Sequence, residues 1–417
     1  MTNRGSACPP LPAERATEDA HHDAPAESAR GSARHRAARR VTAAGAASLL
    51  ACSGAPPSER PREGAPSSQA TPQTSAGADG GAPADAATPD ADNSLEPRAR
   101  GASYRNPVVA RDFPDPFVLR EETAYYAFAT NAAGSNVQAS TSTDLVHWTV
   151  LPDALPNLPS WATAGASLVW APSVLKRGST FIMYYTANVT ALGFQCISRA
   201  VATQPDGPYV DTSAAPLVCQ TSGAEAFCGS IDPSPFVDVD GTPYLFWKSD
   251  ENSPSCATPP RIWVQRLTDD GFALVGPRTA VLARTEAWEY PVIEGPSMVV
   301  DSGRYYLFYS ANTYQSESYG VGYAVCERAT GPCTKRTLDR TDGAPAALVH
   351  STTAALGPGG QEFFVDFSGT AWMAYHAWTA PRMTYAGGGA RSMRIDRITF
   401  VDGAPVFGGP TTDVEAL

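Results

Sequence analysis

Asp115-Pro116-Phe117-Val118 is the first of four similar stretches that decide the fold of this chain. The others follow at intervals of about 60 residues: Ala171-Pro172-Ser173-Val174, Asp232-Pro233-Ser234-Pro235 and Gly295-Pro296-Ser297-Met298. A degenerate fifth copy runs from residue 363 to residue 376. Such self-similarity is typical of propeller blades and solenoid repeats.

Each copy continues in the same way. A turn cluster such as Asp301-Ser302-Gly303 is followed by an aromatic run, then by a third apolar run and a polar edge. The aromatic runs are residues 125–128, 181–185, 244–247 and 305–309. No long helical period interrupts them, so we predict an all-β, five-bladed β-propeller with short, protected sheet edges.

The first part of the chain has a different composition. Residues 1–104 contain few large apolar side chains and cannot bury enough surface to offset their ordering entropy. Basic residues, a weakly apolar stretch and Leu49-Leu50-Ala51-Cys52 resemble a bacterial lipoprotein signal. We therefore predict a signal region at 1–52, a disordered linker at 53–104 and the propeller at 105–417. An Ala-rich tail with an accidental cysteine is the alternative.

Charge and cysteine content restrict the partners and the compartment. The formal net charge of −11 disfavours nucleic acid. No apolar run is long enough for a transmembrane helix, so membrane contact is expected only through a lipid anchor on an exported monomer. Six cysteines follow Cys52, and an even number in an exported domain suggests disulfides, with buried free thiols as the alternative. Cys326 and Cys333 flank a turn and form a plausible pair.

Three of the repeats place a carboxylate at or beside the proline: Asp115, Asp232 and Glu294. An Asp-Pro pair at a strand start is by itself more often structural. The acids do not recur in every copy, however, and equivalent positions of a propeller converge on its axis. Glycoside hydrolysis needs a proton donor and an opposing carboxylate, and a third acid can raise the donor's pKa. Trp170 and Phe113 could stack on a sugar or pack between blades, and we predict that both bind substrate.

Four ordered motifs resemble those of glycoside hydrolase family 43: Asp112-Phe113-Pro114-Asp115-Pro116, Trp170-Ala171-Pro172-Ser173, Ile231-Asp232-Pro233-Ser234 and Ile293-Glu294-Gly295-Pro296. The resemblance covers residues 106–417. It implies a five-bladed propeller that acts on arabinans and xylans with inversion. It also implies Asp115 as general base, Glu294 as general acid and Asp232 as the modulator of the acid's pKa.

The end of the chain resembles the last blade of that family, in Tyr375-His376-Ala377-Trp378 and Arg391-Ser392-Met393-Arg394. We expect Arg391 to contact substrate. Family members often hold calcium or another ion in the central channel near the position of His376. This residue is therefore either a metal ligand or a hydrogen-bonded channel histidine. No cofactor is expected to be required.

The sequence thus predicts an exported glycoside hydrolase that cleaves α-L-arabinofuranosyl linkages of arabinan or arabinoxylan, polysaccharides of the plant cell-wall type. A β-xylosidase is the alternative within the family. A tethered propeller that binds sugar without cleaving it is the alternative outside catalysis, and the presence of all three acids argues against it.

Overall fold

The computed structural model describes residues 103–165, 168–221, 228–250, 258–338 and 346–417. These residues belong to one compact unit of the chain, Asp90–Leu417. The predicted signal region, Cys52 and nearly all of the predicted linker lie outside the described residues. Among the described residues no helix has the length and apolar character needed to cross a membrane.

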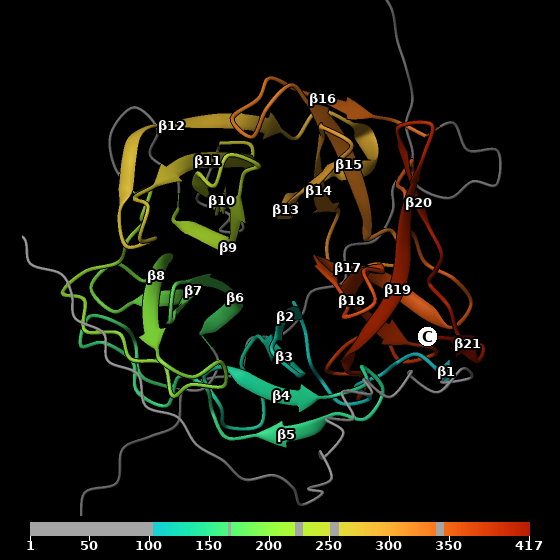
Figure 1. The fold of residues 1–417 in the computed structure, drawn as a ribbon, viewed down its shortest axis with the longest axis horizontal. Coiled ribbons are helices and arrows are strands. Elements are labelled where there is room, and N and C mark those ends of the chain that lie inside the picture. Colours follow the sequence, from blue (N-terminus) through green and yellow to red (C-terminus); the bar gives the residue numbers. More distant parts are fainter. Residues whose placement is uncertain (1–102, 166–167, 222–227, 251–257, 339–345) are drawn as a thin grey trace, which may run out of the picture. The chain divides into compact units, whose positions relative to one another are not determined.

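Five antiparallel sheets surround a central axis (Figure 1). Blade 1 contains β2 (Phe117–Glu121), β3 (Ala124–Ala129), β4 (Gln138–Ser142) and β5 (Thr149–Leu151). Blade 2 contains β6 (Val169–Arg177), β7 (Thr180–Val189) and β8 (Phe194–Ala202). Blade 3 contains β9 (Ser230–Val237), β10 (Pro243–Ser249), β11 (Arg261–Leu267) and β12 (Leu274–Ala283). Blade 4 contains β13 (Ile293–Asp301), β14 (Arg304–Ala311), β15 (Gly320–Cys326) and β16 (Cys333–Arg336). Blade 5 contains β17 (Ala355–Val365), β18 (Ala371–Thr379), β19 (Arg391–Val401) and β20 (Ala404–Phe407). A 3₁₀ turn, η1 (Ala287–Glu289), precedes blade 4. The predicted five-bladed all-β fold is confirmed.

The first strand of each blade is the one nearest the axis (Figure 1). These inner strands contact one another in a complete ring, β2 to β6, β9, β13, β17 and back to β2. The predicted aromatic runs form the second strands, β3, β7, β10 and β14. Their rings fill the interfaces between blades; the centroid of Tyr306 on β14, for example, lies 4.6 Å from that of Phe400 on β19.

The repeated motif has a conformational cause. The residue before the proline has a left-handed backbone in the first four copies, with φ values of 53° at Asp115, 44° at Ala171, 55° at Asp232 and 54° at Gly295. In the fifth copy, which lacks the proline, Gly360 occupies this position with a φ of 59°. In blades 2 to 5 the pairing of the inner strand shifts register at or beside the motif. Such irregularities redirect side chains. Here they direct the start of each inner strand toward the axis.

Blade 2 departs from the predicted pattern of four strands. Among its described residues the expected edge segment makes only an isolated bridge, Val201 with Val210. Pro208 in this segment has no N–H to donate to a ladder, so a regular fourth strand is not supported there. A disulfide between Cys196 and Cys219 ties β8 to the chain beyond this segment. The predicted Cys326–Cys333 disulfide is also present and joins β15 to β16.

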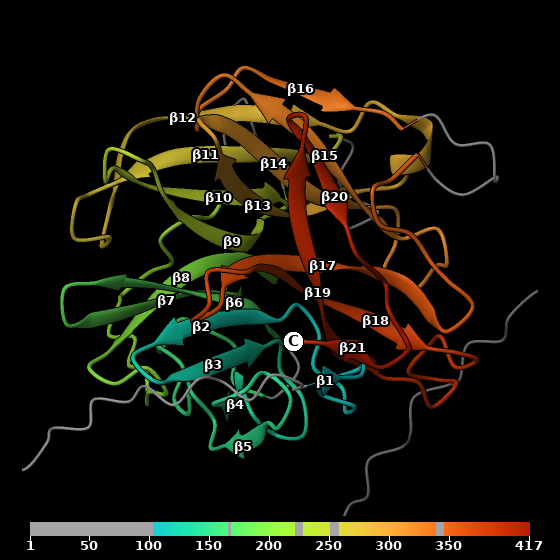
Figure 2. The same cartoon turned by 45° about the vertical axis from the view of Figure 1, so that its right-hand side comes forward.

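The two ends of the described unit lie side by side (Figures 1 and 2). β1 (Ser103–Tyr104), just before the predicted boundary at residue 105, pairs with β21 (Glu415–Ala416). The buried Asn106 side chain then binds blade 5: its amide nitrogen donates to Ile395 O at 2.8 Å, and its oxygen accepts from Ile395 N–H at 3.0 Å. The N-terminal segment therefore holds blade 5 in place before the chain enters blade 1.

Candidate active site

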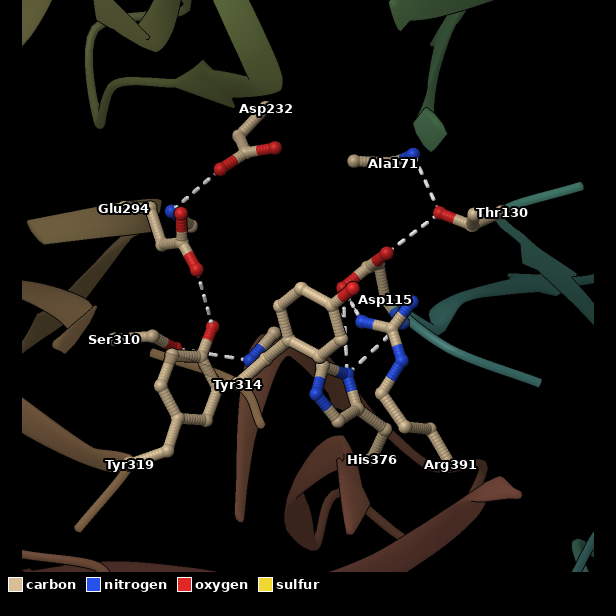
Figure 3. A network of polar contacts seen from close by, with 12 residues as sticks. Asp115, Thr130, Ala171, Asp232, Glu294, Ser310, Tyr314, Tyr319, His376 and Arg391 are labelled. Carbon is tan, nitrogen blue, oxygen red and sulfur yellow. Dashed lines mark hydrogen bonds and ion pairs between the residues drawn. The ribbon is translucent and has the colours of Figure 1, made fainter. Parts of the chain in front are cut away.

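A cavity of about 540 Å³ opens at the axis and is lined by residues from all five blades. It contains the three acids predicted from sequence, together with Trp170 and Arg391. Figure 3 shows the acids in two groups, with Asp232 beside Glu294 and with Asp115 near Arg391 and His376. The repeat therefore brings together carboxylates that are far apart in the chain.

Asp115 is surrounded by donors and positive charge. Thr130 Oγ1 donates to its Oδ2 at 2.5 Å, and Arg391 Nη1 lies 3.5 Å from its Oδ1. His376 Nδ1 lies 3.3 Å from the same oxygen and accepts the Asp115 backbone N–H at 3.1 Å. Burial would raise the pKa of Asp115, but Arg391, His376 and Thr130 outweigh it and hold the pKa well below its usual range. Asp115 is therefore ionised.

Asp232 and Glu294 form the second group. Asp232 Oδ2 accepts the backbone N–H of Gly295 at 3.0 Å, which fixes this carboxyl beside Glu294 (Figure 3). Burial, and then the nearby charge of Glu294, raise the pKa of Asp232 to about 8. Two carboxyls this close resist being ionised together, so the pair retains a proton near neutral pH.

Each oxygen of Glu294 has a partner. Tyr319 Oη donates to Oε1 at 2.9 Å, and Lys248 Nζ lies 3.3 Å from Oε2. The Tyr319 ring also stacks on His376, with 5.9 Å between centroids and 11° between planes. This tyrosine therefore lies between the two groups of acids.

Arg391 starts β19 and is held by aromatic rings. Its guanidinium lies 4.4 Å from the ring centroid of Tyr314, and its Nε donates to Tyr385 Oη at 2.9 Å. Both tyrosines line the cavity. Aromatic faces beside polar donors suit a sugar ring, which has apolar C–H faces and hydroxyl edges. The cavity thus combines an ionised carboxylate, a protonated carboxyl pair and aromatic walls, which is the equipment for acid–base hydrolysis of a glycoside.

Comparison with known proteins agrees with this chemistry. The model of the family described as "Glycosyl hydrolases family 43" matches residues 104–405. The chain belongs to this family. It is accordingly a glycoside hydrolase that acts on glycosidic bonds.

Curated family 43 relatives have several substrates. The chain is 28% identical over 282 residues to Beta-D-galactofuranosidase xynD of Aspergillus niger, an alignment that covers 63% of this chain and 75% of the relative. It is 28% identical over 284 residues to Probable arabinan endo-1,5-alpha-L-arabinosidase A of Aspergillus flavus, covering 63% and 82%. A solved structure of a thermostable family-43 glycoside hydrolase is 31% identical, with a TM-score of 0.64 over 74% of this chain and 97% of that one.

The two aromatic residues singled out in the sequence have different positions. Trp170 on β6 is partly exposed and lines the cavity. Phe113 is 0% exposed and belongs to the core between blades 1 and 5, with the Arg111 guanidinium 4.8 Å from its ring centroid. Its ring therefore packs inside the protein and has no face open to substrate, which corrects the prediction that it binds sugar.

His376 on β18 is a hydrogen-bonded residue of the channel. Burial lowers its pKa, although Asp115 acts in the opposite direction. Its Nε2 is buried without a hydrogen-bond partner among the described residues. Across the described ranges no group of three or more His, Cys, Asp or Glu side chains could hold a metal ion. One imidazole nitrogen falls short of the six to eight oxygen ligands that calcium takes, so these residues do not form a calcium site by themselves and the predicted ion stays a prediction.

A fourth acid, Glu362, also lines the cavity. It stands two residues after Gly360, the position occupied by Ser173, Ser234 and Ser297 in blades 2 to 4. Ser297 Oγ donates to Glu362 Oε2 at 2.5 Å. Burial raises the pKa of Glu362 to about 7, and the hydrogen bonds of the three serines only partly oppose this. Glu362 was not predicted as a site residue, because the fifth copy lacks the proline that marks the other four.

Several other cavity residues were not predicted. Thr130, Tyr314, Tyr319 and Tyr385 lie in loops or at strand ends, where the repeat has no fixed pattern. Lys248 does not line the cavity but contacts Glu294, which does. It carried a signal in the sequence, since it is a charged residue that ends the apolar run Tyr244-Leu245-Phe246-Trp247. A lysine inside a buried strand requires a negative partner, and here that partner is Glu294.

Proposed function

We propose that this chain is an inverting glycoside hydrolase that cleaves α-L-arabinofuranosyl linkages of arabinan or arabinoxylan. The main support is the contrast between the two groups of acids, one held ionised by Arg391 and the other retaining a proton. Family 43 relatives that include an arabinan endo-1,5-alpha-L-arabinosidase support the choice of substrate.

In the proposed mechanism Asp115 is the general base. It takes a proton from a water molecule, whose oxygen attacks the anomeric carbon as the bond to the leaving oxygen breaks. Glu294 is the general acid and gives its proton to that leaving oxygen. One water is consumed, and the attack from the opposite face inverts the anomeric configuration. Asp232 keeps Glu294 protonated by opposing a second negative charge.

A β-D-galactofuranosyl substrate is the second candidate. It is favoured by the similarity to the Aspergillus niger galactofuranosidase. Both candidate sugars have a five-membered furanose ring, and the galactofuranosyl group carries one more CHOH unit outside the ring. The part of the cavity that receives this side arm would decide between them, with Trp170, Tyr314 and Tyr385 as its aromatic walls.

The test uses the full chain on arabinan, arabinoxylan and the 4-nitrophenyl glycosides of α-L-arabinofuranose, β-D-galactofuranose and β-D-xylose. We expect the highest kcat/KM on the arabinofuranosyl substrates, with the inverted anomer first in a proton NMR time course. A retained anomer would contradict Asp115 as base. Binding without any product would favour a sugar-binding propeller, and preference for the xyloside would favour a β-xylosidase.

We also propose that the protein is exported and carries lipid on Cys52. Disulfides within the described residues, among them Cys196–Cys219 and Cys326–Cys333, support export because such bonds persist in oxidising compartments. The wild type should partition into a Triton X-114 detergent phase, and Cys52→Ala should not. Cys8→Ala is the matched control and should partition like the wild type. Equal solubility of wild type and Cys52→Ala would rule out the anchor.

A further inference from the structure

Lys248 is a completely buried lysine in the second strand of blade 3. Its side chain is 0% exposed at the end of β10, directly opposite Ile231 on β9. Transfer of an ammonium group out of water is strongly unfavourable unless negative partners compensate it. The partners of Lys248 therefore indicate why the chain keeps a charge at this position.

Those partners are a candidate catalytic acid and its neighbours. Lys248 Nζ lies 3.3 Å from Glu294 Oε2 on β13 and 3.7 Å from Asp250 Oδ1, just after β10. Asp232, the residue after Ile231, is also within its electrostatic reach: burial and Glu294 raise the pKa of Asp232, and Lys248 acts in the opposite direction. The lysine thus lies across the interface of blades 3 and 4, beside both carboxyls of the protonated pair.

We propose that Lys248 is a positioning residue that sets the acidity of Glu294 and fixes the direction of its carboxyl. This inference rests on the proposed role of Glu294 as general acid. A proton donor must hold its proton before the reaction and release it at the transition state. Asp232 favours the first condition by repulsion, and Lys248 favours the second because its ammonium stabilises the carboxylate that remains.

Asp232 and Lys248 act in opposite directions on the acidity of Glu294. Its other oxygen, Oε1, accepts a hydrogen bond from Tyr319, which faces it from the loop before β15. Asp250 shares the charge of Lys248. Across the cavity, Asp115 faces His376 and Arg391, and the guanidinium of Arg391 compensates its charge locally. Tyr319, Asp232 and Lys248 are thus charged or titratable groups that act directly on Glu294, and Asp250 acts through Lys248.

The first experiment measures how kcat/KM on arabinan depends on pH in Lys248→Met, which keeps the length of the side chain and removes its charge. Glu294 should then hold its proton to higher pH. The basic limb of the pH profile, where kcat/KM falls as the pH rises, should therefore shift to higher pH by about 1–2 units. Asp232→Asn should move the same limb down. An aryl arabinofuranoside with a good leaving group needs little protonation and should show a much smaller change.

Three further variants separate this role from a structural one. Lys248→Met/Asp250→Asn removes both charges of one pair, so it keeps the test available if the single variant folds poorly. Lys248→Arg retains the charge, so the basic limb of its pH profile should lie at the same pH as that of the wild type. Lys335→Met is the matched control, because Lys335 is a largely buried lysine whose Nζ lies 2.6 Å from Glu289 Oε1, outside the cavity lining. Lys335→Met should lower the stability of the protein but leave the basic limb of the pH profile at the wild-type pH.

A second measurement does not depend on turnover. Glutamate labelled with ¹³C at the side-chain carboxyl can be followed by NMR titration, with Glu294→Gln identifying the resonance of Glu294. The titration midpoint of Glu294 should rise in Lys248→Met and return in Lys248→Arg. An unchanged midpoint would overturn the proposal even in an active enzyme. A shifted midpoint in a protein without hydrolytic activity would uphold the electrostatic role and reject the proposed function.

Discussion

Asp115 and Glu294 lie in one cavity but in opposite electrostatic surroundings. Arg391 and hydrogen bonds keep Asp115 charged, whereas Glu294 shares a buried corner with Asp232 and Lys248. The difference comes from the blades that carry these neighbours, since Arg391 belongs to blade 5 and Lys248 to blade 3. Asp115 is therefore ionised, whereas the Asp232–Glu294 pair retains a proton near neutral pH.

This contrast predicts how the loss of each acid affects turnover. Asp115→Asn should lower kcat on every substrate by about 10²–10⁴-fold or more, because no base then activates the water. Glu294→Gln should lower kcat on arabinan by a similar factor but spare aryl substrates with good leaving groups. Initial rates on both substrate types check this. An equal loss on both in Glu294→Gln would contradict its role as the acid.

Glu362 predicts a pH dependence of stability. Burial raises its pKa from the ordinary value of 4.5 to about 7 in the folded protein, so the folded state binds the proton more tightly than the unfolded state. The resulting stabilisation is complete below pH 4.5 and is lost as the pH rises through 7. Glu362→Gln mimics the neutral carboxyl. As the pH is raised from 4.5 to 8, its free energy of unfolding should increase by about 1–3 kcal/mol relative to that of the wild type.

Urea unfolding at both pH values measures this difference. Asp232 titrates in both proteins, so its contribution cancels in the comparison. Glu327→Gln, at an exposed position, is the control and should follow the wild type at both pH values. If the free energies of unfolding of Glu362→Gln and the wild type differed by the same amount at both pH values, the prediction would be contradicted.

At the scale of the element, the start of each inner strand needs a left-handed residue, and two of the five are glycines in very different surroundings. A Cβ on Gly360 would lie 2.6 Å from the His376 ring and 2.7 Å from Asp115 Oδ1. On Gly295 the nearest atom would be Ser310 Oγ at 3.5 Å. The left-handed backbone is similar at both glycines. The difference in the stability cost of a Cβ at the two positions therefore measures the effect of the contacts that Gly360 makes with His376 and Asp115.

We therefore predict that Gly295→Ala costs about 1 kcal/mol of stability, from its left-handed φ alone. Gly360→Ala should cost about 2–5 kcal/mol because Asp115 and His376 must also move. Its activity should fall as well. Denaturant unfolding of the two variants in parallel gives the comparison, and equal costs would show that the base and the histidine adapt freely.

The strands could be predicted from the sequence because aromatic and β-branched runs recur between turn clusters, and the acids could be found because the motif repeats around an axis. The left-handed backbone at the motif could not be seen, since Asp, Ala and Gly all occupy it. Lys248 and Tyr319 were missed because they act across blade interfaces, and the distance between side chains of neighbouring blades is set by packing. Phe113 was misassigned for the same reason: its position in the motif does not reveal which way its ring points.

At the scale of the whole molecule, closure of the ring depends on the segment before blade 1. Asn106 →Ala should lower the free energy of unfolding by about 2–4 kcal/mol, because Ile395 N–H and O lose their buried partner. Asn157→Ala, at an exposed position, should change it by less than about 0.5 kcal/mol. Chemical denaturation of both variants tests this. A small effect of Asn106→Ala would mean that the contacts between inner strands close the ring by themselves.

The pairing of β1 with β21 makes the chain of this unit nearly circular, with Ser103 opposite Ala416. A short linker could join the two ends, and the chain could instead be opened at an exposed hairpin such as the turn at residues 238–241. Because the three acids come from three different blades, such a permuted gene would still bring them to one axis. A domain joined directly to Ser103 or to Leu417 would leave the propeller from the same edge.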